Sequence, residues 1–131
     1  MSDNVTVFEQ YSLQTRPKSA EEQDNQPEYR AIGLEKTGDR QSRLRIHYAD
    51  GTVDVFTYAH LLEISCTDEQ HLLLCFSNRI ILLEGTHLEA LIEPLQDEKV
   101  RYLVCFNGNY YAQPAADEVV IETITRQNLL G

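Results

Sequence analysis

Residues 71–84 contain two short apolar runs that meet at a turn, and no other feature of the sequence constrains the fold as strongly. The runs 71–76 and 79–84 are each of strand length, and Ser77-Asn78 between them suits a two-residue turn because Asn tolerates positive φ. We therefore predict a β-hairpin in which His71 lies opposite Glu84. One face of this hairpin then carries Leu72, Leu74, Phe76, Ile81 and Leu83, and the other carries Leu73, Cys75, Ile80 and Leu82.

Both faces of the predicted hairpin are apolar, whereas an antiparallel strand with one face in water alternates apolar and polar residues. Each face must therefore be covered, either by the rest of the fold or by another subunit. The apolar side chains that a second subunit could contact form the candidate interface, which comprises Leu72, Leu73, Leu74, Ile80, Ile81 and Leu82.

An amphipathic helix is predicted over about residues 87–97, directly after the hairpin. Gly85 is expected to end the second strand, and Thr86 with Glu89 to form a capping box that starts the helix. Pro94 lacks a backbone donor and limits the helix to roughly three turns. The helix presents one apolar stripe that can cover a face of the hairpin, formed by Leu88, Leu91, Ile92 and Leu95.

Other segments alternate apolar and polar residues or are rich in β-branched residues, as strands are. The segments with this pattern are 29–36, 43–48, 52–57, 100–105 and 118–125. Asp50-Gly51 is a strong hairpin turn signal, and Tyr110-Tyr111 is expected to start a further extended piece. Residues 58–65 and 117–126 are each compatible with strand or helix, and we favour strand for both. The predicted fold is a single α+β domain, mainly an antiparallel bent sheet or small barrel of six to eight strands with one amphipathic helix.

The chain of 131 residues has the usual size of one domain. Residues 1–28 are polar and acidic and are expected to form an N-terminal arm with a short ordered segment near 5–8, whereas 29–131 form the globular domain. The sequence has no apolar run of membrane-spanning length, and its start lacks the pattern of a signal peptide. We therefore expect a cytoplasmic protein without a membrane partner.

A formal net charge of −10 limits the partners of this protein. A field of this sign repels phosphate backbones and anionic membrane surfaces, so neither nucleic acid nor membrane is expected as a partner. One local exception is the candidate anion or ligand surface on the exposed side of the 43–48 strand, which consists of Arg40, Arg43, Arg45 and His47. Guanidinium groups match carboxylate and phosphate geometry, although a charged edge or face that pairs across strands with Asp54 and other acids explains the same pattern.

The sequence contains no recognisable catalytic constellation, metal-ligand frame or cofactor motif. The four histidines stand outside any H-E-x-x-H frame, and the three cysteines form neither a C-x-x-C pair nor a metal spacing. We therefore expect no metal, no cofactor and no catalytic residue. His71 and Glu84, opposite each other in the hairpin, form a candidate pH-sensitive pair. An aromatic cluster near one loop is more typical of packing than of a ligand site, and it comprises Tyr102, Phe106, Tyr110 and Tyr111.

These observations favour a non-catalytic interaction domain that binds a protein partner, including a second copy of itself, through the apolar surface of the hairpin. The alternative is a small-ligand or anion-binding module that uses Arg43, Arg45 and His47, with the tyrosines of the aromatic cluster as further candidates, and it requires these groups to converge on a concave pocket. A small hydrolase-type enzyme with His60 or His71 as the base ranks third. Nucleic-acid binding through the arginine stripe ranks last.

Overall fold

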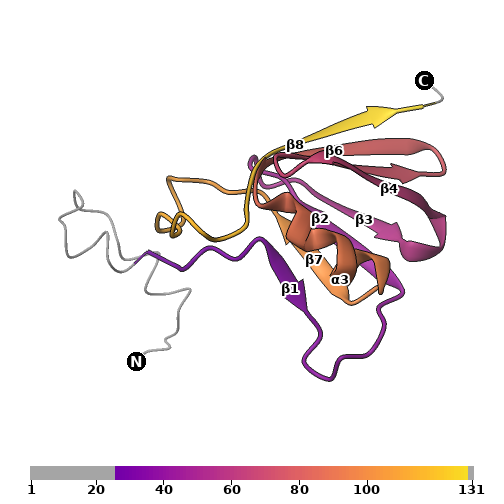
Figure 1. Cartoon of the computed structure of the whole chain (residues 1–131), viewed down its shortest axis with the longest axis horizontal. Helices are drawn as coiled ribbons and strands as arrows, with labels where there is room; N and C mark the ends of the chain where they lie inside the picture. The colour runs from indigo at the N-terminus through magenta and orange to yellow at the C-terminus, as the bar shows by residue number, and fades with distance from the viewer. Residues whose placement is uncertain (1–25, 130–131) are drawn as a thin grey trace.

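Two four-stranded sheets build the part of the chain that the computed structural model describes, residues 26–129. The first sheet has the strand order β1 (Ile32–Leu34), β7 (Val100–Val104), β2 (Arg43–His47), β3 (Val53–Thr57). The second sheet has the order β4 (Leu61–Asp68), β5 (His71–Phe76), β6 (Arg79–Thr86), β8 (Val120–Asn128). All neighbouring strands are antiparallel except β2 and β7, which run parallel. The predicted α+β class with a mainly antiparallel sheet is confirmed, and the sheets do not close into a barrel (Figure 1).

Strands β5 and β6 form the predicted hairpin in the predicted register. His71 pairs with Glu84, and Leu74 pairs with Ile81. One face of the hairpin is buried, with exposures of at most 2% for Leu72, Leu74, Phe76, Ile81 and Leu83. The hairpin lies between β4 and β8, so both of its strands have paired neighbours on either side. This central position removes the exposed backbone edge that a two-stranded ribbon would present.

The hydrophobic core lies between the inner faces of the two sheets. Leu44 and Ile46 of β2 and Leu103 of β7 enter it from the first sheet and have no exposed surface. The rings of Phe56 in β3 and Phe76 in β5 stack across the two sheets, with centroids 4.3 Å apart. Burying one leucine or phenylalanine side chain stabilises a fold by about 1.5–3 kcal/mol, so these contacts hold the sheets together.

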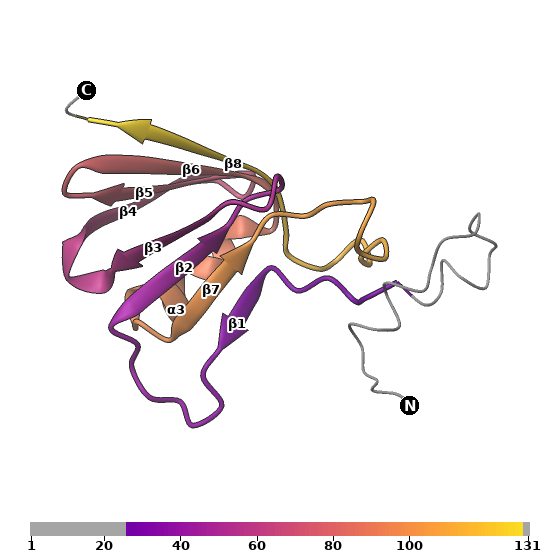
Figure 2. The same cartoon turned by 180° about the vertical axis from the view of Figure 1, so that it is seen from behind.

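The helical segment after the hairpin consists of a 3₁₀ turn, η2 (Leu88–Leu91), followed by a short α-helix, α3 (Ile92–Gln96). Leu88, Leu91 and Leu95 are buried, as the predicted apolar stripe requires. The segment contacts the second sheet at β4, β5 and β6. It lies on the near side of β2 and β7 in Figure 1 and on their far side in Figure 2. The helical segment therefore covers the core between the two sheets.

The predicted capping box at Thr86 and Glu89 and the predicted end of the strand at Gly85 are both wrong. β6 continues through Gly85 to Thr86, and the 3₁₀ turn follows His87, which has a left-handed backbone at φ 58° and makes no side-chain capping bond. The reason is the close approach of β8, because a Cβ on Gly85 would lie 1.8 Å from the carbonyl oxygen of Val120. Gly85 permits close strand pairing and does not end the strand.

Residues 58–65 combine the two structures that their sequence allows, since the 3₁₀ turn η1 (Tyr58–His60) leads directly into β4. Residues 117–126 hold most of β8, as favoured from their β-branched content. The extended piece expected at Tyr110-Tyr111 is wrong. Both backbone amides donate to the carbonyl oxygen of Asn107, at 3.0 and 2.9 Å, and this closes a turn instead.

The expected N-terminal arm, residues 1–28, lies mostly outside the described residues, and so does its ordered segment near 5–8. Within the described range, the first core residue is Tyr29, which is 2% exposed. Among residues 26–129, no helix combines the length and the apolar character needed to cross a bilayer.

Candidate functional site

The outer face of the first sheet carries most of the predicted ligand surface. Leu44 and Ile46 of β2 point into the core, so Arg43, Arg45 and His47 point outward because side chains alternate along a strand. Arg40 lies in the loop before β2 and is exposed. The outer face is the side of β2 and β7 away from the helical segment, which Figure 2 presents to the reader.

A hollow of about 480 Å³ opens on this outer face and is termed the cationic hollow. Strand β2 and the turn after it form one wall, and β7 and the loop after it form the other. Its polar and aromatic lining includes Arg45, His47, Arg101, Tyr102, Asn107 and Tyr111. Of the predicted ligand surface, Arg45 and His47 line the hollow, whereas Arg40 and Arg43 do not.

The parallel pairing of β2 with β7 creates this hollow. Arg45 pairs with Tyr102, and the two strands point the same way, so the segments that follow them leave at the same end. The Cys105 amide donates to the His47 carbonyl oxygen at 2.9 Å and continues the pairing beyond β7. The turn at Asn107 then brings its side chain and the following tyrosines over the outer face.

The cationic hollow concentrates positive charge in an acidic protein. Among the described residues that line it, none is Asp or Glu. Within residues 26–129, Arg45 forms no ion pair, and Arg101 lies 3.6 Å from Glu35 in a surface pair that contributes at most about 1 kcal/mol. Burial and the neighbouring Arg45 cation lower the pKa of His47, so this imidazole is predominantly neutral at pH 7.

Asp54 does not neutralise the cationic face, so the predicted pairing of the arginines with Asp54 is wrong. The Tyr48 hydroxyl donates to the Asp54 carboxylate at 2.7 Å, and Arg126 donates to the same carboxylate at 2.7 Å. The Arg126 contact links β3 to β8 on the other side of the first sheet. Asp54 is therefore directed away from Arg43 and Arg45, because adjacent positions of paired strands alternate between faces.

Arg101 lines the hollow but is absent from the predicted ligand surface, whereas Tyr102 comes from the predicted aromatic cluster. The Tyr102 ring lies directly over Gly33 of β1, where an added Cβ would be 2.0 Å from a ring carbon. It also meets the His47 ring edge to face, with centroids 5.8 Å apart. Tyr102 is thus separated from the rest of the predicted aromatic cluster. In the sequence, the one sign of this close approach is the glycine between two apolar residues of β1. A glycine does not indicate which side chain lies over it.

The other aromatic residues of the predicted cluster pack around a buried tyrosine. Tyr29 meets Phe106 and Tyr111 edge to face, at centroid distances of 5.1 and 5.3 Å. The Tyr29 hydroxyl donates to the Val104 carbonyl oxygen at 2.6 Å and accepts from the Ile121 amide at 3.0 Å. This cluster fixes the loop that forms one wall of the cationic hollow.

The outer face of the second sheet is apolar at its centre. Leu73 and Cys75 of β5 and Ile80 and Leu82 of β6 are each partly exposed there and are termed the apolar outer patch. The edge strands place polar residues beside it, namely Glu63, Ser65, Thr125 and Gln127. Three residues of the candidate interface are not part of this patch. Leu72, Leu74 and Ile81 have no exposed surface, because they face the first sheet.

The candidate pH-sensitive pair lies at one end of the patch. His71 Nε2 is 3.6 Å from a Glu84 carboxylate oxygen, and Nδ1 is 2.9 Å from Asp68 Oδ1. The hydrogen bond with Asp68 raises the pKa of His71, and the Glu84 carboxylate adds to this rise. Asp68 was not predicted as a partner, since its approach depends on the geometry of the turn between β4 and β5.

The described residues provide no desolvated base at the histidines considered for catalysis. His60 is exposed, and the carboxylates beside His71 are about half exposed, at 53% for Asp68 and 44% for Glu84. General base catalysis favours a carboxyl or imidazole whose pKa is tuned by burial or charge toward the working pH. All three cysteines are free thiols, and burial is the main factor that raises the pKa of each. A raised pKa disfavours the nucleophilic thiolate.

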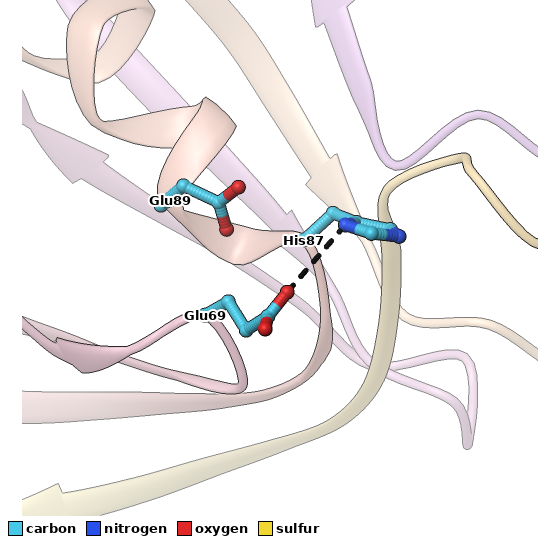
Figure 3. Close-up of side chains that lie close together, drawn as sticks. All are labelled: Glu69, His87 and Glu89. Carbon is cyan, nitrogen blue, oxygen red and sulfur yellow. Dashed lines mark ion pairs between the residues drawn. The ribbon is translucent and has the colours of Figure 1, made fainter.

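A third group of side chains lies where the turn between β4 and β5 meets the start of η2. Glu69, His87 and Glu89 point toward one another (Figure 3), and one donor atom from each lies within 4.8 Å of the others. They are termed the Glu69–His87–Glu89 triad. No metal ligands were expected from the sequence, because these residues have no metal spacing along the chain and meet only in the folded protein.

Comparisons with protein-family models, with curated proteins and with solved structures give no match for this chain. A fold class alone does not specify a function, so the functional argument depends on the local chemistry of these sites. Three sites are available for it: a cationic hollow, an apolar outer patch and a triad of potential metal ligands.

Proposed function

We propose that the protein is a non-catalytic binding module whose cationic hollow takes a small organic anion. The observation that carries this proposal is the convergence of two guanidinium groups, an imidazole and aromatic rings on one hollow that no carboxylate of residues 26–129 lines. Convergence on a concave surface is the condition that separates a ligand site from a merely charged sheet face. The volume of about 480 Å³ lies within the usual range for small-molecule sites.

The lining residues indicate which chemical groups the anion should carry. Arg45 offers a planar fork of donors to a carboxylate or phosphate, and no described acidic residue occupies it. The ring of Tyr102 provides an apolar surface beside that charge. The neutral His47 imidazole can donate or accept one hydrogen bond. A carboxylate or phosphate attached to a small planar group fits this combination.

Replacing Arg45 by glutamine is expected to weaken anion binding by about tenfold or more, because a hydrogen bond to a charged group contributes about 1.5–3 kcal/mol. Binding of inorganic phosphate, succinate and benzoate to the full chain would be measured by NMR titration at constant ionic strength. The expected response is a saturable shift of signals from β2, β7 and the loop at 107–111.

Arg43→Gln is the matched control for Arg45→Gln. It removes the same charge from the same face of β2 but at a position that does not line the hollow. Affinity in this variant is expected to stay within about twofold of the unmodified protein. Equal losses in the two variants would indicate a general charge effect and would contradict a site in the hollow.

The apolar outer patch supports a second function, contact with another copy of this chain. Four apolar side chains lie together at the centre of a sheet face, and polar residues flank them on both edge strands. An apolar centre with a polar rim is the usual arrangement of a protein interface. A symmetric dimer covers such a patch with an identical one and needs no other component.

Replacing Leu82 by aspartate is expected to abolish self-association, because a dimer would bury the new charge without a partner. Sedimentation equilibrium across a wide concentration range would report the mass of both proteins. Val55→Asp is the control, since Val55 is a 55% exposed apolar residue on the outer face of the other sheet. If the unmodified chain is strictly monomeric, or if both variants dimerise normally, the patch is not a self-association surface.

A further inference from the structure

The backbone holds the Glu69–His87–Glu89 triad together. The Leu88 amide donates to the Glu69 carbonyl oxygen at 2.7 Å, and the Gly85 amide donates to the Gln70 carbonyl oxygen at 3.1 Å. These two bonds fix the turn between β4 and β5 against the segment that leads into η2. The three side chains therefore approach one another because of main-chain pairing and not only through their own rotamers (Figure 3).

The hydrogen bond on the far side of the His87 ring determines which nitrogen faces the glutamates. His87 Nε2 lies 3.2 Å from the carbonyl oxygen of Ala116. A carbonyl oxygen only accepts, so Nε2 carries the proton, and in the neutral ring Nδ1 presents its lone pair. Nδ1 is the atom that faces Glu69, at 3.7 Å from its carboxylate oxygen. Metal-binding histidines are characteristically oriented in this way by a carbonyl on the second nitrogen.

The distances within the triad suit one small metal ion. Two ligands bonded at about 2.1 Å to a tetrahedral ion lie about 3.4 Å apart. The separation of 3.7 Å between His87 Nδ1 and Glu69 is close to that value. Glu69 and Glu89 are exposed, so their side chains can rotate to close the wider separation of up to 4.8 Å.

The charge of the triad also fits a divalent cation. When they bind a metal, carboxylate ligands are ionised and an imidazole ligand is neutral, so the three groups together bring two negative charges, which a divalent ion balances. A set of one imidazole and two carboxylates suits transition metals better than Mg²⁺ or Ca²⁺, which prefer oxygen ligands alone. Three protein ligands leave one tetrahedral position for water, as in many zinc sites.

We propose that Glu69, His87 and Glu89 form a binding site for one divalent transition-metal ion, with Zn²⁺ as the best fit. Such an ion would connect the turn between β4 and β5 to the start of η2, and through His87 to the loop at Ala116. The site is independent of the cationic hollow, with which it shares no residue.

Zn²⁺ binding to the full chain without an affinity tag would be measured by competition with a chromophoric chelator. We expect one Zn²⁺ per chain, with affinity at least tenfold lower in Glu89→Gln and in His87→Asn. Asparagine is chosen because it tolerates the left-handed backbone of His87. Co²⁺ would serve as a spectroscopic probe, and its visible absorption should show a four-coordinate ion that is lost in both variants.

Two control variants match these substitutions outside the triad. Glu93→Gln removes an exposed glutamate from α3, and His60→Asn removes an exposed histidine from η1. Both are expected to bind Zn²⁺ as the unmodified protein does. The proposal is overturned if the chain binds no Zn²⁺ at micromolar concentrations, which leaves a surface ion pair between His87 and Glu69 only. It is also overturned if Glu89→Gln and His87→Asn bind as tightly as the controls.

Discussion

Gly85→Ala is expected to destabilise the protein by more than about 3 kcal/mol. The new methyl group would lie 1.8 Å from the carbonyl oxygen and 2.9 Å from the carbonyl carbon of Val120. These atoms belong to the backbone of β8, so the clash cannot be relieved by rotating a side chain. The strands must separate at this point, and the pairing of Gly85 with Ile121 and of Thr86 with Val120 is lost. Urea denaturation followed by circular dichroism would measure the loss.

Gly108→Ala provides the matched control for this substitution. A Cβ at Gly108 would meet the nearest atom, a ring carbon of Phe106, at an ordinary contact distance of 3.6 Å. Its effect on the free energy of unfolding is expected to stay within about 0.5 kcal/mol. If Gly85→Ala were as well tolerated as Gly108→Ala, β8 could not approach β6 as closely as described.

Tyr29→Phe is expected to cost about 2–4 kcal/mol, although it removes a single oxygen atom. The hydroxyl donates to Val104 in the first sheet and accepts from the Ile121 amide in the second, so it joins the two sheets. Without it, a buried amide and a partly buried carbonyl lose a partner, and each such loss costs about 1–3 kcal/mol, with the smaller cost for the partly buried carbonyl. Urea denaturation would give the cost, and an unchanged m-value would confirm that the folded state remains compact.

Tyr58→Phe offers a graded comparison within the same core. The Tyr58 hydroxyl donates to the Val100 carbonyl oxygen at 2.7 Å but has no second bond among the described contacts. Its removal should therefore cost about half as much as the removal of the Tyr29 hydroxyl. A cost for Tyr58→Phe equal to or greater than that for Tyr29→Phe would argue against the bridging role of Tyr29.

The hairpin shows how far local pattern alone could predict this fold. The strand lengths, the two-residue turn and the pairing of His71 with Glu84 follow from burial and turn sterics that act within fourteen consecutive residues. The predicted capping box is wrong because local rules consider only neighbouring residues and take no account of distant segments. Thr86 and Glu89 have the right spacing, but the approach of β8 from more than thirty residues away keeps Thr86 in the strand.

The candidate site was predicted only in part. Alternation along β2 placed Arg45 and His47 on one outer face, and that expectation needed no partner strand. It also grouped them with Arg43, which lies on the same face but outside the hollow. Arg45 lines the hollow and Arg43 does not, and this difference depends on which residues of β7 lie beside each of them. The alternation of side chains along β2 contains no information about that neighbouring strand.

The amino-acid sequence by itself determined the local elements of this protein: the apolar hairpin, the amphipathic segment after it, and the side of β2 on which the cationic groups stand. Short-range sterics and the burial of apolar side chains decide these features. Only the tertiary structure decided that β7 lies parallel to β2, that Arg101 and Tyr102 join Arg45, and that Glu69 meets His87 and Glu89. Contacts between distant segments depend on how all the elements pack together, since no single segment specifies its neighbour.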